Sequence, residues 1–255
     1  MNDNASEPAV LTERRGRVQI ITLNRPDQMN AINGDLSTGL WAAVQELNTD
    51  PTLAAGVLTG NGKGFCAGMD LKAFARGEDI GPMFDFIQAG AEKPLIAAIE
   101  GFALAGGLEL ALSCDLLVAA KGAKLGIPEV KVGLFAAGGA VIRLPSRVGY
   151  GKAMEMAMTG DPISAEEGSQ YGLISRLSDP GGALDAAVEL AEKVAGNAPL
   201  GVAASKEIIR ASVGGTEEEL WAVQRPLQAS VFVSNDAAEG PAAFAEKRKP
   251  NWSGT

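Results

Sequence analysis

Glu109 and Glu129 are the side chains of this sequence best suited to acid–base chemistry. The chain of 255 residues contains no histidine, so proton transfer falls to carboxylates, lysines, tyrosines or the two cysteines. Each glutamate ends a stretch of mostly small and apolar residues, GFALAGGLE over 101–109 and LGIPE over 125–129. Burial there would raise the pKa of a carboxyl group and make it a proton donor. The alternative is that each glutamate only stabilises the positive end of a helix.

Glycine-rich turns accompany both glutamates. Two of them, GKGFCAGMDL over 62–71 and AGGLE over 105–109, follow predicted strands, where glycine allows a sharp turn that leaves backbone N–H groups free. One such turn alone is typical of an ordinary strand–helix connection. Two together predict N–H groups that converge on one carbonyl oxygen, as in an oxyanion hole. Asp70 is expected to cap the following helix, and the turn GLFAAGG over 133–139 offers further N–H groups to a water molecule or a ligand.

The composition narrows the class of protein. Apolar residues make up 46% and charged residues 21%, which predicts a globular chain. A net charge of −9 with 5% aromatic residues argues against a general binder of nucleic acid or of anionic membranes. Cys66 and Cys114 form no CxxC pair, so we expect buried, reduced thiols, a cytoplasmic protein and no Cys/His zinc site. We also expect no signal peptide and no membrane span.

Apolar periodicity predicts the elements that position these residues. Strands are expected at 18–23, 54–59, 94–99 and 116–119, and helices at 35–48 and 106–113. Short apolar strands that alternate with helices predict parallel pairing and an α/β fold. Residues 73–90 lack clean periodicity and are expected to form a mobile segment near a site. Beyond residue 180 the pattern predicts helices at 183–195, 201–212, 217–233 and 237–249.

The motifs, taken in order, resemble the enoyl-CoA hydratase/isomerase, or crotonase, superfamily. They are LNRPDQMNAI over 23–32, GFCAGMDL over 64–71, KPLIAAIEG over 93–101, AGGLEL over 105–110, GIPE over 126–129, RLP over 143–145 and FAEKRK over 244–249. Each motif alone is weak, whereas the ordered set runs from about residue 18 to residue 252 and is specific.

The resemblance implies a crotonase-like α/β fold, a spiral of ββα units with a helical C-terminal region. The expected organisation is a flexible N-terminal tail over 1–12, a spiral core over 13–195 and a helical trimerisation region over 196–255. Members of the family bind acyl-CoA thioesters and form homotrimers, often paired into hexamers. Coenzyme A belongs to the substrate, so neither a further cofactor nor a metal is expected.

The resemblance also assigns residues. The oxyanion-hole N–H groups would be those of Met69 and Gly106, which would grip the thioester oxygen. Glu129 would deliver the α-proton, and Glu109 would orient and deprotonate the water. The substrate and CoA site would comprise Met29, Ala31, Ala67, Gly68, Asp70, Leu71, Lys72, Ala137 and Lys247, with the two lysines paired to phosphates. Together these assignments describe an enoyl-CoA hydratase that adds water to a trans-2-enoyl thioester.

Three residues depart from the hydratase pattern that the resemblance implies. Ala105 stands where many hydratases have an extra glycine, Ala137 lies in the loop FAAGG where PGAGG is typical, and Met69 is bulkier than the usual alanine. Two alternatives stay open. A Δ3-Δ2 enoyl-CoA isomerase can work with Glu129 alone, and a non-catalytic member of the fold would bind acyl-CoA without turnover.

Overall fold

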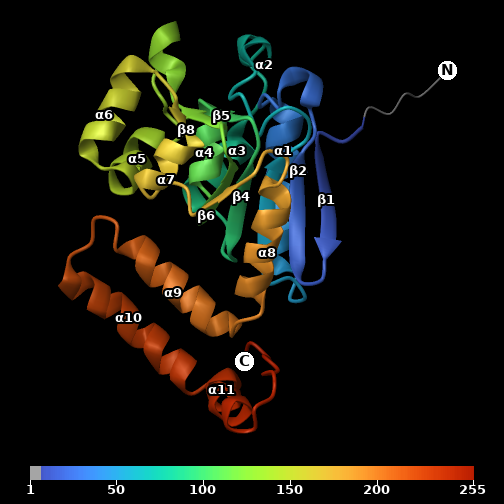
Figure 1. Ribbon diagram of the computed structural model, residues 1–255, viewed down its shortest axis with the longest axis vertical. Helices are drawn as coiled ribbons and strands as arrows, with labels where there is room; N and C mark the ends of the chain where they lie inside the picture. Colours follow the sequence, from blue (N-terminus) through green and yellow to red (C-terminus); the bar gives the residue numbers. More distant parts are fainter. Residues whose placement is uncertain (1–6) are drawn as a thin grey trace, which may run out of the picture. The chain divides into compact units, whose positions relative to one another are not determined.

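The computed structural model describes residues 7–255 (Figure 1). Contacts divide the chain into two compact units, Met1–Ala191 and Glu192–Thr255, which are described separately. Among the described residues, no helix is both long and apolar enough to cross a membrane.

The larger sheet of the first unit has six strands in the order β1-β2-β3-β4-β6-β9. Only β1 and β2 pair in antiparallel fashion, and the other neighbours in this sheet are parallel, which confirms the predicted α/β pairing. The strands are β1 (Val10–Arg15), β2 (Val18–Leu23), β3 (Ala55–Gly60), β4 (Leu95–Ile99), β6 (Leu116–Ala120) and β9 (Arg176–Ser178). The apolar runs predicted as strands form β2, β3, β4 and β6, and all five residues of β4 are buried.

A second sheet, in the order β5-β7-β8, was not predicted. Its strands β5 (Phe102–Leu104), β7 (Lys124–Gly126) and β8 (Ile163–Ser164) are two or three residues long, too short for a periodicity signal. The predicted tail was wrong at residues 10–12, which belong to the edge strand β1. That strand reads VLTERR and is mostly exposed, so it lacks an apolar face. Residues 1–6 of the predicted tail lie outside the described residues.

The helices α1 (Gly34–Thr49) and α4 (Gly106–Leu112) confirm their predictions, and Asn33 caps α1 by accepting from the Leu36 N–H. Residues 73–90, which lack clean periodicity, contain α3 (Gly81–Ala89) and the end of α2 (Leu71–Ala75), and the mobility expected of this segment stays a prediction. Gly81 and Pro82 open α3 rather than interrupt it.

Further along the unit come α5 (Ala140–Val148), α6 (Tyr150–Thr159) and α7 (Ala165–Gln170), together with the short 3-10 helices η1 (Pro26–Gln28) and η2 (Pro128–Val132). Helix α1 packs against α3, α4 against α5, and α5 against α6. One apolar core joins the sheet to these helices, with Leu40, Leu58, Phe86 and Leu108 fully buried. The core therefore anchors α4, the helix that carries Glu109.

The C-terminal helices predicted from the sequence are present as α8 (Ala183–Ala195), α9 (Pro199–Ala211), α10 (Glu217–Phe232) and α11 (Asn235–Ala245). Within the second unit, α9 and α10 lie side by side (Figure 1). Asp236 in α11 is buried, and its carboxylate accepts from the N–H groups of Ser253 and Gly254 and from the Ser253 hydroxyl. The last residues of the chain are thus tied to the start of α11.

We expect Asp236→Ala to destabilise the protein by about 1.5–3 kcal/mol, because it removes the buried carboxylate that accepts hydrogen bonds from Ser253 and Gly254. Urea unfolding measures the change, with Asp185→Ala as the control. The Asp185 side chain is 86% exposed and 3.6 Å from Arg15, so its removal should cost less than about 0.5 kcal/mol. Equal effects of the two substitutions would contradict the role given to Asp236.

Candidate active site

The segment over residues 65–70 is held between two neighbouring stretches of backbone. On one side the Ile32 N–H donates to the Gly68 carbonyl at 2.8 Å, and the Asp70 N–H donates to the Ile32 carbonyl at 2.9 Å. On the other side the Leu104 N–H donates to the Cys66 carbonyl at 3.0 Å. Strand-like bridges on both sides fix the position of this turn beside the start of α4.

The N–H groups of Met69 and Gly106 lie close together at this turn. Backbone groups alternate along a bridge, so the bonds of Gly68 and Asp70 to Ile32 direct the Met69 N–H to the opposite side. Gly106 is the first residue of α4, where a helix leaves its N–H groups without intrahelical acceptors. A Cβ on Gly68 would lie 3.1 Å from the Gly106 nitrogen, and a Cβ on Gly106 would lie 3.7 Å from the Met69 nitrogen. Neither N–H donates a hydrogen bond within residues 7–255.

Ala105 supports this pair from a conformation that alanine rarely adopts. Its φ is +51° and its ψ −131°, and its N–H donates to the Gly126 carbonyl at 2.9 Å. Such a conformation costs a non-glycine residue about 1–3 kcal/mol. The departure from glycine noted in the sequence is therefore accommodated, with backbone strain next to the Gly106 N–H.

Asn30 holds the loop that leads into the turn. It is fully buried with a φ of +54°, and its Nδ2 lies 2.9–3.1 Å from the carbonyl oxygens of Asn61, Gly64 and Phe65. Its Oδ1 accepts from the Arg25 N–H at 2.9 Å. Sequence reasoning missed this positioning role, although Asn30 stood within the motif over 23–32.

Asp70 caps α2, as predicted. Its Oδ1 accepts from the N–H groups of Lys72 and Ala73 at 3.1 Å each, and its Oδ2 lies 3.1 Å from Arg25 Nη2. The bond from the Ala73 N–H, helped by Arg25, lowers the pKa of Asp70. Arg25 also donates to the Ala31 carbonyl, so one guanidinium links the loop around Ala31 to Asp70 at the start of α2.

Glu109 is buried in the first turn of α4, with 5% of its surface exposed. The Ala140 N–H donates to its Oε1 at 3.2 Å. Burial raises the pKa of Glu109, and the charge on Glu129 adds to this, whereas the N–H groups of Ala140 and Gly138 and the charge on Arg143 lower it. The carboxylate therefore sits in a desolvated place with backbone donors aimed at it.

Glu129 is half-buried in η2, next to Pro128, and is near enough for its charge to act on Glu109. Its Oε2 is buried and has no hydrogen-bond partner among the described residues. Burial raises the pKa of Glu129. Two interacting carboxyl groups with raised pKa values favour a state with one proton between them, which suits paired acid and base roles.

The remaining residues of the expected substrate site fall into three groups. Ala67 and Gly68 lie within the turn and Met29 and Ala31 beside it, and the Ala67 N–H donates to the Met29 carbonyl at 3.0 Å. Leu71 and Lys72 are exposed on α2. Ala137 is exposed and is not among the residues with positive φ, and Lys247 follows α11 in the second unit. Contact of these residues with a substrate stays a prediction.

The predicted burial of both cysteines is confirmed, and neither forms a disulfide within residues 7–255. Burial raises the pKa of Cys66 to about 12, which makes this thiol a poor nucleophile. Within residues 7–255, no group of three or more His, Cys, Asp or Glu side chains is placed to hold a metal ion.

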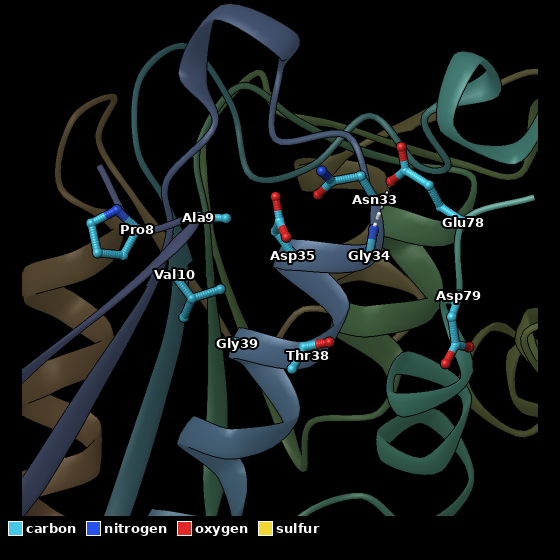
Figure 2. A pocket seen from close by; sticks show the side chains of 10 residues that line it. All are labelled: Pro8, Ala9, Val10, Asn33, Gly34, Asp35, Thr38, Gly39, Glu78 and Asp79. Atoms are coloured by element: carbon cyan, nitrogen blue, oxygen red, sulfur yellow. Dashed lines mark hydrogen bonds between the residues drawn. The ribbon is translucent and has the colours of Figure 1, made fainter. Parts of the chain in front are cut away.

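A separate cavity of about 670 Å³ lies at the start of α1 (Figure 2). Glu78 reaches across to Gly34, whose N–H donates to Oε2 at 3.2 Å, and Asp35 and Thr38 line the cavity from α1. Neither Glu109 nor Glu129 is among its lining residues. It is a groove distinct from the carboxylate pair.

Known proteins of similar sequence and structure share this architecture. The model of the enoyl-CoA hydratase/isomerase family matches residues 13–255. The chain is 40% identical to enoyl-CoA hydratase EchA19 from Mycobacterium tuberculosis, over 97% of each sequence. It is 41% identical to carnitinyl-CoA dehydratase from Salmonella paratyphi A, over 98% of this chain and 99% of the relative. A crystal structure of an enoyl-CoA hydratase from M. tuberculosis is 52% identical, with a TM-score of 0.95 over 98% of this chain and 100% of that chain.

The chain belongs to the enoyl-CoA hydratase/isomerase family. Its fold is the crotonase fold expected from the motifs, with two sheets and a helical C-terminal region.

The raised pKa of Glu129 predicts a pH-dependent effect on stability. Because its folded-state pKa lies above the ordinary 4.5, the protonated form favours folding, and this contribution is lost as pH rises above 4.5 through the folded pKa. Glu129→Gln should therefore raise Tm relative to the parent more at pH 8 than at pH 5. One pKa unit corresponds to about 1.4 kcal/mol, or about 2–4 °C.

Thermal unfolding at both pH values measures this, with the exposed Glu92→Gln as the control. A Glu129→Gln effect that is independent of pH would show that burial does not disfavour the charged carboxylate.

Proposed function

We propose that this protein is an enoyl-CoA hydratase, which adds water across the trans-2 double bond of an enoyl-CoA thioester. The observation that carries the proposal is the combination of a buried Glu109, a half-buried Glu129 whose charge acts on it, and two neighbouring free N–H groups in one fold unit. The printed names of the relatives, enoyl-CoA hydratase and carnitinyl-CoA dehydratase, support it, because both describe the addition or removal of water on a CoA thioester.

In this proposal the N–H groups of Met69 and Gly106 bind the thioester oxygen. They polarise the conjugated carbonyl and stabilise the enolate that forms when the β-carbon is attacked. A water oxygen forms a bond to the β-carbon, one water proton passes to a carboxylate, and the other carboxyl group gives a proton to the α-carbon. The atoms balance with substrate, water and the two glutamates, so the step requires no metal and no redox cofactor.

The surroundings of the two glutamates suggest which one plays each part. Glu109 accepts a hydrogen bond from the Ala140 N–H, and such donors favour the ionised carboxylate. We therefore assign Glu109 the role of general base that takes a proton from the water. Glu129 Oε2 is buried without a donor, which favours a protonated carboxyl group, so we assign it delivery of the α-proton. The two roles match the expectation from the sequence.

We also propose that Met29, Ala31, Ala67, Gly68, Asp70 and Leu71 bind the CoA portion, chiefly through backbone, with Lys72 and Lys247 paired to phosphates and Ala137 beside the water. A homotrimer, or a hexamer of two trimers, is proposed as the working assembly. Exposed apolar residues in each unit support assembly, since Ile142 and Tyr150 in the first unit and Phe232 and Phe244 in the second are each at least 72% exposed. A cytoplasmic location stays a prediction.

The experiment follows loss of the conjugated enoyl-thioester absorbance of crotonyl-CoA and of a longer trans-2-enoyl-CoA. Glu109→Gln and Glu129→Gln should each lower kcat by about 10²–10⁴-fold, since each removes one proton-transfer partner. Parallel reactions with carnitinyl-CoA and with a 3-enoyl-CoA separate the named alternatives.

Isomerisation of the 3-enoyl-CoA that needs Glu129 and not Glu109 would favour the isomerase. Binding of crotonyl-CoA without turnover of any of these substrates would favour a non-catalytic acyl-CoA-binding protein. Either result would overturn the hydratase proposal.

Gly138 offers a geometric test of the place of Glu109. A Cβ at this position would lie 2.5 Å from Glu109 Oε2 and 2.8 Å from its Cδ, so Gly138→Ala must displace the carboxylate or the turn. A displacement of this size should lower kcat for crotonyl-CoA by about 10²-fold. Gly151→Ala is the matched control, because nothing lies within 4 Å of its added Cβ. Unchanged turnover by Gly138→Ala would mean that Glu109 is not needed at this place.

A further inference from the structure

Arg143 joins three helices around the candidate site, through a motif to which the proposed function gives no part. It lies one turn into α5, and its Nη1 donates to the Ser113 hydroxyl at 3.2 Å. Its Nη2 donates to the carbonyl of Ile87 in the last turn of α3. Ser113 is the C-terminal cap of α4, so one guanidinium sits at the ends of two helices, where positive charge is favourable.

The turn that donates to Glu109 packs directly on this guanidinium. A Cβ on Gly139 would lie 3.1 Å from Arg143 Nη1, and the Arg143 N–H donates to the Gly139 carbonyl at 3.0 Å. The next residue, Ala140, donates to Glu109 Oε1. From the other side, the Ser113 hydroxyl that accepts from Arg143 donates to the Glu109 carbonyl at 2.8 Å. Arg143 is therefore linked to Glu109 through both of its neighbours.

We propose that Arg143 is a positioning residue for the Glu109 carboxylate, because it fixes the 138–140 turn against α3 and α4 and so keeps the N–H groups of that turn on the carboxylate. The inference rests on the proposed function, in which Glu109 must be ionised to take a proton from water. Two charged groups act on Glu109 from packed elements, Glu129 of η2 and Arg143 of α5. The first raises and the second lowers the pKa of Glu109, so loss of Arg143 removes the opposing charge.

Arg147 provides the matched control on the same helix. Its Nη2 lies 3.3 Å from the carbonyl oxygens of Leu112 and Cys114, so it also binds the C-terminal end of α4. Unlike Arg143, it is not a leading cause of the shift in the pKa of Glu109. A purely structural role of the α4–α5 contact would make the two arginines equivalent, whereas the proposal makes them different.

The first experiment compares Arg143→Met, Arg143→Lys and Arg147→Met by the pH dependence of kcat and kcat/KM for crotonyl-CoA. Arg143→Met should lower kcat by about 10–100-fold. It should also shift the acidic limb of the pH profile of kcat/KM toward higher pH by about half a pH unit or more. Arg143→Lys keeps the charge without the planar fork, so the limb should return toward the parent while kcat stays reduced. Arg147→Met should change kcat less than about twofold and leave the limb in place.

An unmoved limb in Arg143→Met, or an equal loss in Arg147→Met, would overturn the proposal. In either case Arg143 would be only a structural contact.

The second experiment does not depend on turnover. Urea unfolding at pH 5 and pH 8 gives the effect of Glu109→Gln on stability in the parent and in the Arg143→Met background. At pH 8, Glu109→Gln should raise the free energy of unfolding more in the Arg143→Met background than in the parent. In that background the buried Glu109 carboxylate has lost the nearby positive charge of Arg143. Equal gains would overturn the inference. A larger gain in a protein that hydrates neither crotonyl-CoA nor a longer trans-2-enoyl-CoA would refute the proposed function and leave the link between Arg143 and Glu109 standing.

Discussion

The site depends on how closely three stretches of backbone approach one another around residues 65–70. A Cβ on Gly107 would lie 2.2 Å from the Cys66 carbonyl oxygen, and one on Gly101 would lie 2.1 Å from the Lys63 carbonyl oxygen. No side chain fits at either place, so the helix α4 can begin beside the turn only because these positions are glycine. The same approach brings the nitrogens of Met69 and Gly106 together, and it places Glu109 one turn further along α4.

Burial of Glu109 sets a second constraint, since a carboxylate removed from water needs compensation from its surroundings. The compensation comes from one stretch of the chain, residues 138–143, which supplies the N–H groups of Gly138 and Ala140 and the cation of Arg143. Glu129 works against it through like charge. The site is thus a balance between groups that favour a charged Glu109 and groups that favour a neutral one, and small displacements of the turn change that balance.

The sequence predicted the parts of the fold that have a strong apolar pattern. Strands β2, β3, β4 and β6 are buried runs, and α1 has a clear helical period, so each was found close to its true bounds. The second sheet was missed because its strands gain their stability from partners distant in sequence and not from their own pattern. Helix α3 was missed because residues 73–90 lack clean apolar periodicity, although Gly81 and Pro82 mark a helix start.

The two glutamates of the candidate site could be predicted from the sequence, whereas the residues that position the site could not. The absence of histidine and the glycine-rich turns pointed to Glu109 and Glu129, and in the structure Glu109 is buried and Glu129 is half-buried, with a charge that raises the pKa of Glu109. The supporting roles of Asn30 and Arg143 were not predictable, because they depend on carbonyl groups that only the folded chain brings within reach.

The buried amide of Asn30 also bears on how the protein ages. Deamidation would turn its NH₂ donor into a carboxylate oxygen that faces the carbonyls of Asn61, Gly64 and Phe65, three acceptors with nothing left to accept. In the native fold those hydrogen bonds fix the amide, and the Ala31 nitrogen that would attack it donates its N–H to the Gln28 carbonyl at 3.0 Å, so the reaction is hindered as long as the loop is formed. A chain kept unfolded has no such protection, and one that has deamidated at this position loses the donor on which closure of the loop depends.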